Sequence, residues 1–154
     1  MRSLLRSFQY ALKGIQATMN GERNFRIHLT AMVYVLFFSR FYQLDVSQYA
    51  LLLVVFAVML SAEMMNTAVE ELVNREFEGY HPMAKKAKDI AAGAVMVCAM
   101  AAVGVGLLFF WNVRVLLSIF TYFALRPLAM GLLLLSFVFS ILFIMGRFCD
   151  KDQL

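Results

Sequence analysis

The sequence predicts an all-α integral membrane protein, and two features of its 154 residues support this fold class. Hydrophobic residues make up 62% of the chain and charged residues 16%, whereas soluble domains have about 45–50% and about 25%. The apolar residues also form long runs, and a helix needs about 20 residues to cross a membrane. With only two prolines and 15 phenylalanines, the chain favours helices in lipid over an ordinary soluble domain.

Residues 3–20 are predicted to form an amphipathic helix on the membrane surface, because apolar and polar residues alternate with the helical period. The apolar face carries Leu4, Leu5, Phe8, Leu12, Ile15 and Met19, and the polar face Arg6, Gln9, Lys13, Gln16 and Asn20. The alternative is a helix packed on a soluble core, which little else in the chain suggests.

Four apolar stretches follow, and each is expected to be a transmembrane helix: residues 27–42, 48–73, 90–111 and 128–146. The first is short, and Arg40 near its end has a side chain long enough to reach the interface. Residues 112–127 are apolar but interrupted by Arg114 and by Arg126 and Pro127. They form either an interfacial helix or the start of a long fourth helix kinked at Pro127.

The positive charges indicate how the chain is oriented. Basic residues occur at Arg2, Arg6, Lys13, Arg23 and Arg26, and again at Arg75, Lys85, Lys86 and Lys88, whereas the turn 43–47 offers only Asp45. The positive-inside rule therefore places the N-terminus and the loop 74–89 in the cytoplasm. Basic residues beside apolar spans also suit anionic lipid and do not suggest nucleic acid. We expect no cleavable signal peptide, and Cys98 and Cys149 to be reduced.

A polar constellation follows the apolar run 50–59. Glu63, Asn66 and Glu70 are spaced i, i+3 and i+7, so they share one helix face, and Glu71 follows. An unpaired carboxylate taken out of water costs several kcal/mol or more. We expect this helix face to be a functional site, because ionisable residues within spans are functional by default.

Two other segments bring charged groups to the same membrane level. Lys88 and Asp89 begin the third span, and the segment before the first span carries Glu22, Arg23, Arg26 and His28. Magnesium is bound by carboxylate oxygens together with substrate phosphates, and a separate carboxylate can deprotonate an attacking hydroxyl. The alternative is that these charges pair with one another and only hold the helices together.

Four segments resemble the bacterial diacylglycerol kinase/undecaprenol kinase family of small integral-membrane lipid kinases. They are "FQYALKGI" (8–15), "ERNFRIH" (22–28), "EMMNTAVEELVN" (63–74) and "YHPMAKKAKDIAAGAV" (80–95). The resemblance covers about residues 1–111, which we expect to be the lipid kinase domain, with 112–154 as a C-terminal extension that carries the extra transmembrane helix. Like the family, the chain has no Walker loop.

The resemblance implies a role for each matching residue. Glu63 matches the catalytic base, and Glu22 and Glu70 match the metal ligands. The residues that match nucleotide contacts are Tyr10, Asn66, Gly79, Tyr80, His81, Lys88 and Asp89. It further implies ATP as co-substrate, Mg²⁺, a membrane lipid alcohol as acceptor and a homotrimer with shared active sites. It places the protein in the bacterial inner membrane with its active site on the cytoplasmic side.

The lipid acceptor and catalysis itself stay open. "ERNFRIH" resembles the undecaprenol kinase branch, but diacylglycerol is not excluded. Asn74 stands where many members have Asp, and Ser3 where a basic residue is usual. Both favour a second hypothesis, a relative that has lost catalysis and serves as a membrane scaffold or lipid-binding protein. A third, a small transporter, would use the same carboxylates without consuming ATP.

Overall fold

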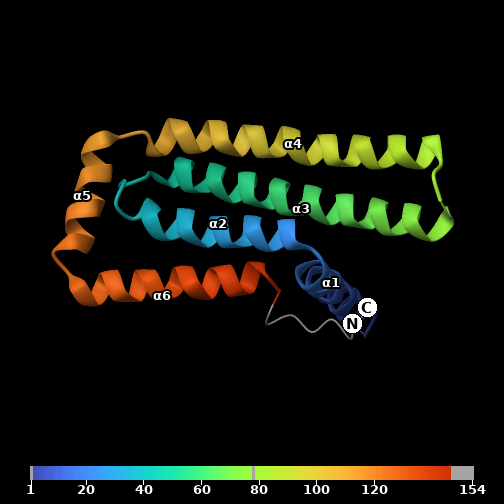
Figure 1. Cartoon of the computed structure of the whole chain (residues 1–154), viewed down its shortest axis with the longest axis horizontal. Coiled ribbons are helices and arrows are strands. Elements are labelled where there is room, and N and C mark those ends of the chain that lie inside the picture. The colour runs from blue at the N-terminus through green and yellow to red at the C-terminus, as the bar shows by residue number, and fades with distance from the viewer. Residues whose placement is uncertain (1, 78, 147–154) are drawn as a thin grey trace.

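The computed structural model describes residues 2–77 and 79–146, with side chains from residue 4 onward. Cys149 and the Ser3 side chain therefore lie outside the described parts. Within them the chain forms helices and no strands (Figure 1). The helices are α1 (Arg2–Gly21), α2 (Arg23–Ser39), α3 (Val46–Glu76), α4 (Pro82–Phe110), α5 (Val113–Ala124) and α6 (Pro127–Ile144). This confirms the predicted all-α fold class.

Four helices run alongside one another in the order α4, α3, α2, α6 (Figure 1). The contacts agree with this order, since α3 packs on α4 and on α2, and α2 packs on α6. Helix α5 crosses one end of the row, while α1 meets the start of α2 at the other. The helix predicted over residues 3–20 is thus present as α1, next to the end where α2 begins.

Local sequence signals explain where the helices begin. Asp45 caps α3 in a capping box with Gln48, and Pro82 and Pro127 stand in the first turns of α4 and α6, where proline needs no hydrogen-bond partner. The Asn112 side chain accepts hydrogen bonds from the first amides of α5. Because the chain breaks before Pro127, residues 113–124 form a separate helix and not the start of a kinked fourth span.

Three helices of the described chain are long and apolar enough to cross a membrane: α3, α4 and α6. Helix α5 is apolar but shorter. Helix α2 has 17 residues, or roughly 25 Å, which is at the lower limit for a crossing. The 31 residues of α3 span roughly 46 Å, so α3 exceeds the membrane core of about 30 Å.

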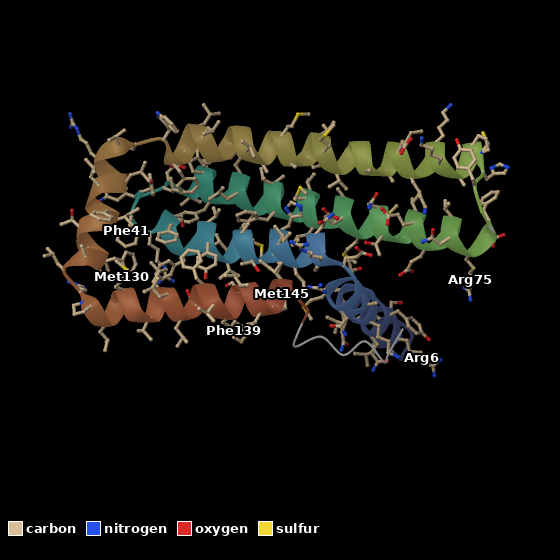
Figure 2. All side chains as sticks on the ribbon, in the orientation of Figure 1. Arg6, Phe41, Arg75, Met130, Phe139 and Met145 are labelled. Atoms are coloured by element: carbon tan, nitrogen blue, oxygen red, sulfur yellow. The ribbon has the colours of Figure 1, made fainter. Side chains whose placement is uncertain are left out.

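The excess length of α3 lies at one end. Figures 1 and 2 show α3 and α4 projecting beyond α2, with Arg75 near the projecting end of α3. Met145, which follows α6, lies at the same end of the row as the start of α2 (Figure 2). The residues of α3 that lie beside the start of α2 are therefore at the boundary between the row of four helices and the part where only α3 and α4 continue. Cys98 lies within α4, half-buried and with a free thiol.

Candidate active site

Glu63 is a buried carboxylate at the centre of the candidate site. Its exposed fraction is 3%, and the buried residues of α3 are Leu52, Met59, Glu63 and Thr67. Their spacing of seven, four and four residues gives one helix face. Glu63 is thus an acidic residue on the otherwise uncharged, buried face of α3. The Thr67 hydroxyl donates to the main-chain carbonyl of Glu63 at 3.0 Å.

His28 of α2 faces this carboxylate across the helix interface. Its Nε2 lies 3.1 Å from Glu63 Oε1, and the His28 side chain is 28% exposed. The two atoms are within ion-pair distance but lack hydrogen-bond geometry, so Oε1 accepts no hydrogen bond from the residues that the structure describes. A buried oxygen in this position keeps its capacity to accept a proton or a hydrogen bond from a ligand.

Asn66 and Glu70 occupy the next two turns of the same face. Asn66 Nδ2 donates to Glu70 Oε1 at 2.8 Å, which fixes the orientation of both side chains. The Asn66 Oδ1 atom is buried and has no hydrogen-bond partner in the described structure. Since buried polar atoms are nearly always satisfied, this oxygen is a second open acceptor beside Glu63.

Glu22 joins the site from the short break between α1 and α2. Burial, and then the negative charges of Glu70, Glu63 and Glu71, raise the pKa of the Glu22 carboxyl, while Arg26 lowers it. Carboxylates from α3 and from the α1–α2 break thus repel one another across one site. Their mutual repulsion would be relieved by a bound cation.

The donor set fits magnesium held jointly by protein and substrate. No group of three or more His, Cys, Asp or Glu side chains is placed to hold a metal among the described residues. Magnesium does not require such a cage, because it takes one or two carboxylates together with phosphate oxygens and waters. Glu22, Glu70 and the open Asn66 oxygen match that requirement.

Lys88 and Asn74 connect α4 to α3 farther along the projecting part. Lys88 Nζ donates to Asn74 Oδ1 at 2.6 Å. Asn74 therefore supplies an acceptor oxygen to Lys88 although it carries no charge. Asp89, the next residue of α4, is exposed.

The remaining predicted nucleotide contacts are open to solvent. Tyr10 on α1 is 68% exposed, and Tyr80, between α3 and α4, is 81% exposed. Gly79 has φ +93°, and the His81 ring stacks on Phe77 with centroids 4.6 Å apart. These residues are available to a ligand from water, but the structure does not bring them into contact with Glu63.

An apolar groove leads away from Glu63 between α2, α3 and α4. It has a volume of about 270 Å³, and His28 lies in its lining together with Met32, Val35, Leu52, Met59 and Phe110. Met59 is one turn before Glu63 on α3. Glu63 does not itself line the groove, but the groove reaches His28, the residue that contacts its carboxylate.

Two relationships at the site were not predicted from the sequence. The sequence placed His28 near the membrane level of Glu63 but gave no reason to pair them. It also grouped Arg26 with the other cations, although Arg26 is only 6% exposed and its Nη1 donates to main-chain carbonyls of α1. Its immediate neighbours Phe25 and Ile27 are apolar, but the residues beyond them are polar, so nothing in this segment indicated that Arg26 is buried.

Comparison with known proteins identifies the family. Residues 9–110 match the model of the prokaryotic diacylglycerol kinase family. The undecaprenol kinase of Bacillus subtilis is 37% identical over 110 residues, which cover 71% of this chain and 89% of that protein. The diacylglycerol kinase of Synechocystis is 40% identical over 105 residues, covering 68% of this chain and 60% of that protein. That of Escherichia coli K12 is 25% identical over 109 residues. The chain belongs to the prokaryotic diacylglycerol kinase family.

Proposed function

We propose that this protein is a lipid kinase that transfers the γ-phosphate of ATP to the hydroxyl of a membrane lipid alcohol, with magnesium. Membership of the family and the names of its relatives support lipid kinase activity. The observation that carries the proposal is the buried Glu63 carboxylate, whose Oε1 accepts no hydrogen bond from the described residues. It lies 3.1 Å from His28, and His28 lines an apolar groove.

Glu63 is the proposed general base. A lipid chain in the groove would bring its terminal hydroxyl to the end where His28 lies beside Glu63. Glu63 would accept the hydroxyl proton as the lipid oxygen attacks the γ-phosphorus, the bond from the γ-phosphorus to the β–γ bridging oxygen would break, and ADP would leave. Proton transfer of this kind contributes about 10²–10⁴-fold to a rate. His28 limits the movement of the carboxylate, and the surrounding apolar side chains exclude water that would compete as acceptor.

Glu22 and Glu70 are the proposed magnesium ligands. When bound, the metal neutralises the charge of the transferring phosphates, which is a main requirement of phosphoryl transfer. Asn66 holds Glu70 in place through its amide and offers its free oxygen to the same region. The repulsion that raises the Glu22 pKa supports a site whose carboxylates need a cation.

The nucleotide would bind on the projecting part of α3 and α4. Lys88, oriented by Asn74, is the proposed phosphate contact, and Asp89 is a further proposed nucleotide contact. Tyr10, Gly79, Tyr80 and His81 would provide the remaining contacts. Their exposure supports entry of ATP from water while the lipid arrives from the bilayer.

The cellular setting follows from the same arrangement. We propose that the N-terminus and the projecting helices face the cytoplasm of a bacterial inner membrane, that residues 1–111 form the catalytic unit and that the protein is a homotrimer with shared sites. The apolar window of α4 is not buried within the single chain, which leaves surface for lipid or for other copies. Glu63, in contrast, is already shielded within one chain.

Undecaprenol is the preferred acceptor and diacylglycerol the alternative. The undecaprenol kinase of Bacillus subtilis is 37% identical and matched over 89% of its length, whereas the diacylglycerol kinase of Synechocystis is 40% identical but matched over 60% of its length. The segment 22–28, which resembles the undecaprenol kinase branch, supports the first choice. The second candidate function is a relative without catalysis, which the uncharged Asn74 favours. The intact set of Glu22, Glu63 and Glu70 opposes it.

Phosphorylation of a lipid in micelles tests the proposal. Purified protein would receive γ-labelled ATP and Mg²⁺ with either undecaprenol or diacylglycerol, and the label in the organic phase would be counted. We expect label in the lipid, and faster transfer to undecaprenol. Absence of label with both lipids, from protein that elutes as a folded species, would overturn the proposal and favour the relative without catalysis.

A further inference from the structure

Helix α6 lies outside the part of the chain that matches the family, yet its C-terminal end contacts Arg26, one turn after Glu22. It packs on α2 and α5 (Figure 1). The contact between α6 and α2 extends from Ser136, in the middle of α6, to Ile144, its last residue. Ile144 meets Arg26 in the first turns of α2, so the contact ends one turn from Glu22.

Polar groups fix the register of α6 on α2. The Tyr34 hydroxyl of α2 lies 3.0 Å from the hydroxyls of both Ser136 and Ser140, and its ring stacks on Phe137 with centroids 4.9 Å apart. Ser136, Ser140 and Ile144 are spaced by four residues, so they lie on one stripe of α6. This stripe, from the Tyr34 contact to the helix end, faces α2.

Arg26 holds the ends of two helices together. Its Nε donates to the main-chain carbonyl of Ile144 at 3.2 Å, and its Nη1 donates to those of Met19 and Asn20 at 2.9 Å each. These carbonyls belong to the last turns of α6 and α1, where intrahelical partners are missing and the helix dipole is negative. One nearly buried guanidinium thus caps the C-terminal ends of α1 and α6.

The backbone after α6 is shaped around this guanidinium. Gly146 has φ +72°, and a Cβ at this position would lie 3.2 Å from Arg26 Nη2. Both the left-handed conformation and the close approach favour glycine. Gly131, at the start of the same helix, has nothing within 4 Å of an added Cβ, so close packing at glycine is not a general property of α6.

Arg26 is also coupled to Glu22. The two residues are one turn apart, and the Arg26 amide donates to the Glu22 carbonyl at 3.4 Å. The Arg26 charge lowers the pKa of Glu22 against the neighbouring carboxylates. A shift of the guanidinium would therefore move the α1–α2 break and change the field at Glu22.

We infer that α6 is an intramolecular brace, which through the Ile144 carbonyl and Gly146 holds Arg26 in place and thereby positions Glu22 for magnesium and ATP. Arg26 and Gly146 are positioning residues in this account, and neither contacts the reacting atoms. The inference rests on the proposed function for the role of Glu22. The brace itself rests only on the contacts of α6, Arg26 and α1.

Gly146→Ala in the full chain tests the brace, with Gly131→Ala as its matched control. Hydrogen–deuterium exchange would be measured in micelles for the amides of residues 20–26, and kcat and KM for Mg–ATP in parallel. For Gly146→Ala we expect exchange and KM to rise roughly twofold to thirtyfold, the range expected for coupling of this kind, with kcat changed by less than about twofold. Gly131→Ala should match the unmodified protein in all three.

Unchanged exchange at residues 20–26 in a folded Gly146→Ala protein would overturn the brace, as would equal effects of the two glycine variants. If Gly146→Ala does not fold, Tyr34→Phe replaces it, because it removes the hydroxyl contacts with Ser136 and Ser140 without adding volume. It should raise exchange at the same amides, and no rise would again overturn the inference. Hydrogen–deuterium exchange tests the brace even if the unmodified protein transfers no phosphate. A failure of the brace inference can therefore be distinguished from a failure of the proposed function.

Discussion

His28 Nε2 lies 3.1 Å from Glu63 Oε1, and this contact joins α2 to α3 where the apolar groove ends. The same Glu63 Oε1 accepts no hydrogen bond from the described residues. The imidazole therefore lies against the proposed base and restrains it without donating a hydrogen bond to it. This relationship yields the first prediction.

His28→Ala should lower kcat by about tenfold or more, because a base that moves by about 1 Å can lose much of its effect. The KM for Mg–ATP should change by less than about twofold, since His28 lines the groove and lies away from the projecting part of α3 and α4, where the nucleotide is proposed to bind. Steady-state kinetics with saturating lipid would measure both. His28→Gln keeps a nitrogen donor near the Nε2 position, so it should recover part of kcat. Equal losses in Ala and Gln variants would argue against restraint of Glu63.

Glu70→Gln should raise the Mg²⁺ concentration needed for half-maximal activity by about tenfold or more, a loss typical of weakened metal sites. The glutamine oxygen can still accept from Asn66, so the change removes charge while preserving shape. A magnesium titration at fixed ATP would measure the effect. Glu76→Gln, an exposed carboxylate near the end of α3, is the control. Coincident titration curves for the two variants would remove Glu70 from the metal site.

Glu22→Gln should stabilise the metal-free protein near neutral pH. The native pKa of Glu22 is raised above its ordinary value of 4.5, first by burial and then by neighbouring carboxylates. The native state therefore binds this proton more tightly than the unfolded state, and the free energy of unfolding falls as pH rises from about 4.5 through the native pKa. The Glu22→Gln variant has no carboxyl to titrate at this position, so it does not lose this free energy of unfolding. It should therefore be more stable than the unmodified protein above the native pKa of Glu22 and equally stable below pH 4.5.

Thermal unfolding in micelles would test the Glu22 prediction. With a chelator near pH 7, Glu22→Gln should melt at a higher temperature than the unmodified protein. Magnesium should then stabilise the unmodified protein more than the variant, because a ligand stabilises the state that binds it. Identical melting temperatures of the two proteins with a chelator near pH 7 would contradict the raised pKa.

Much of the fold could be predicted from the sequence because local signals determine it. The amphipathic pattern of residues 3–20 predicted α1, and long apolar runs predicted α3, α4 and α6. Membership of the lipid kinase family was confirmed as well. The segment 112–127 was left ambiguous, because proline both kinks helices and begins them, and only packing decides between these outcomes.

The contacts between distant segments could not be predicted. His28 and Glu63 are 35 residues apart in the chain, and no pattern in either segment names the other as partner. The Arg26–Ile144 contact uses a main-chain carbonyl, which any residue would supply. The roles of Glu22, Glu63, Glu70 and the nucleotide contacts stay predictions until kinetics test them.

Glu63→Gln tests the central claim most directly. Glutamine keeps the volume of the side chain but cannot accept the hydroxyl proton at neutral pH. Transfer of labelled phosphate to lipid should fall by at least about 100-fold, while binding of Mg–ATP, measured by calorimetry on the same preparation, should stay within about twofold. Near-normal transfer by a folded Glu63→Gln protein would contradict the assignment of Glu63 as the base.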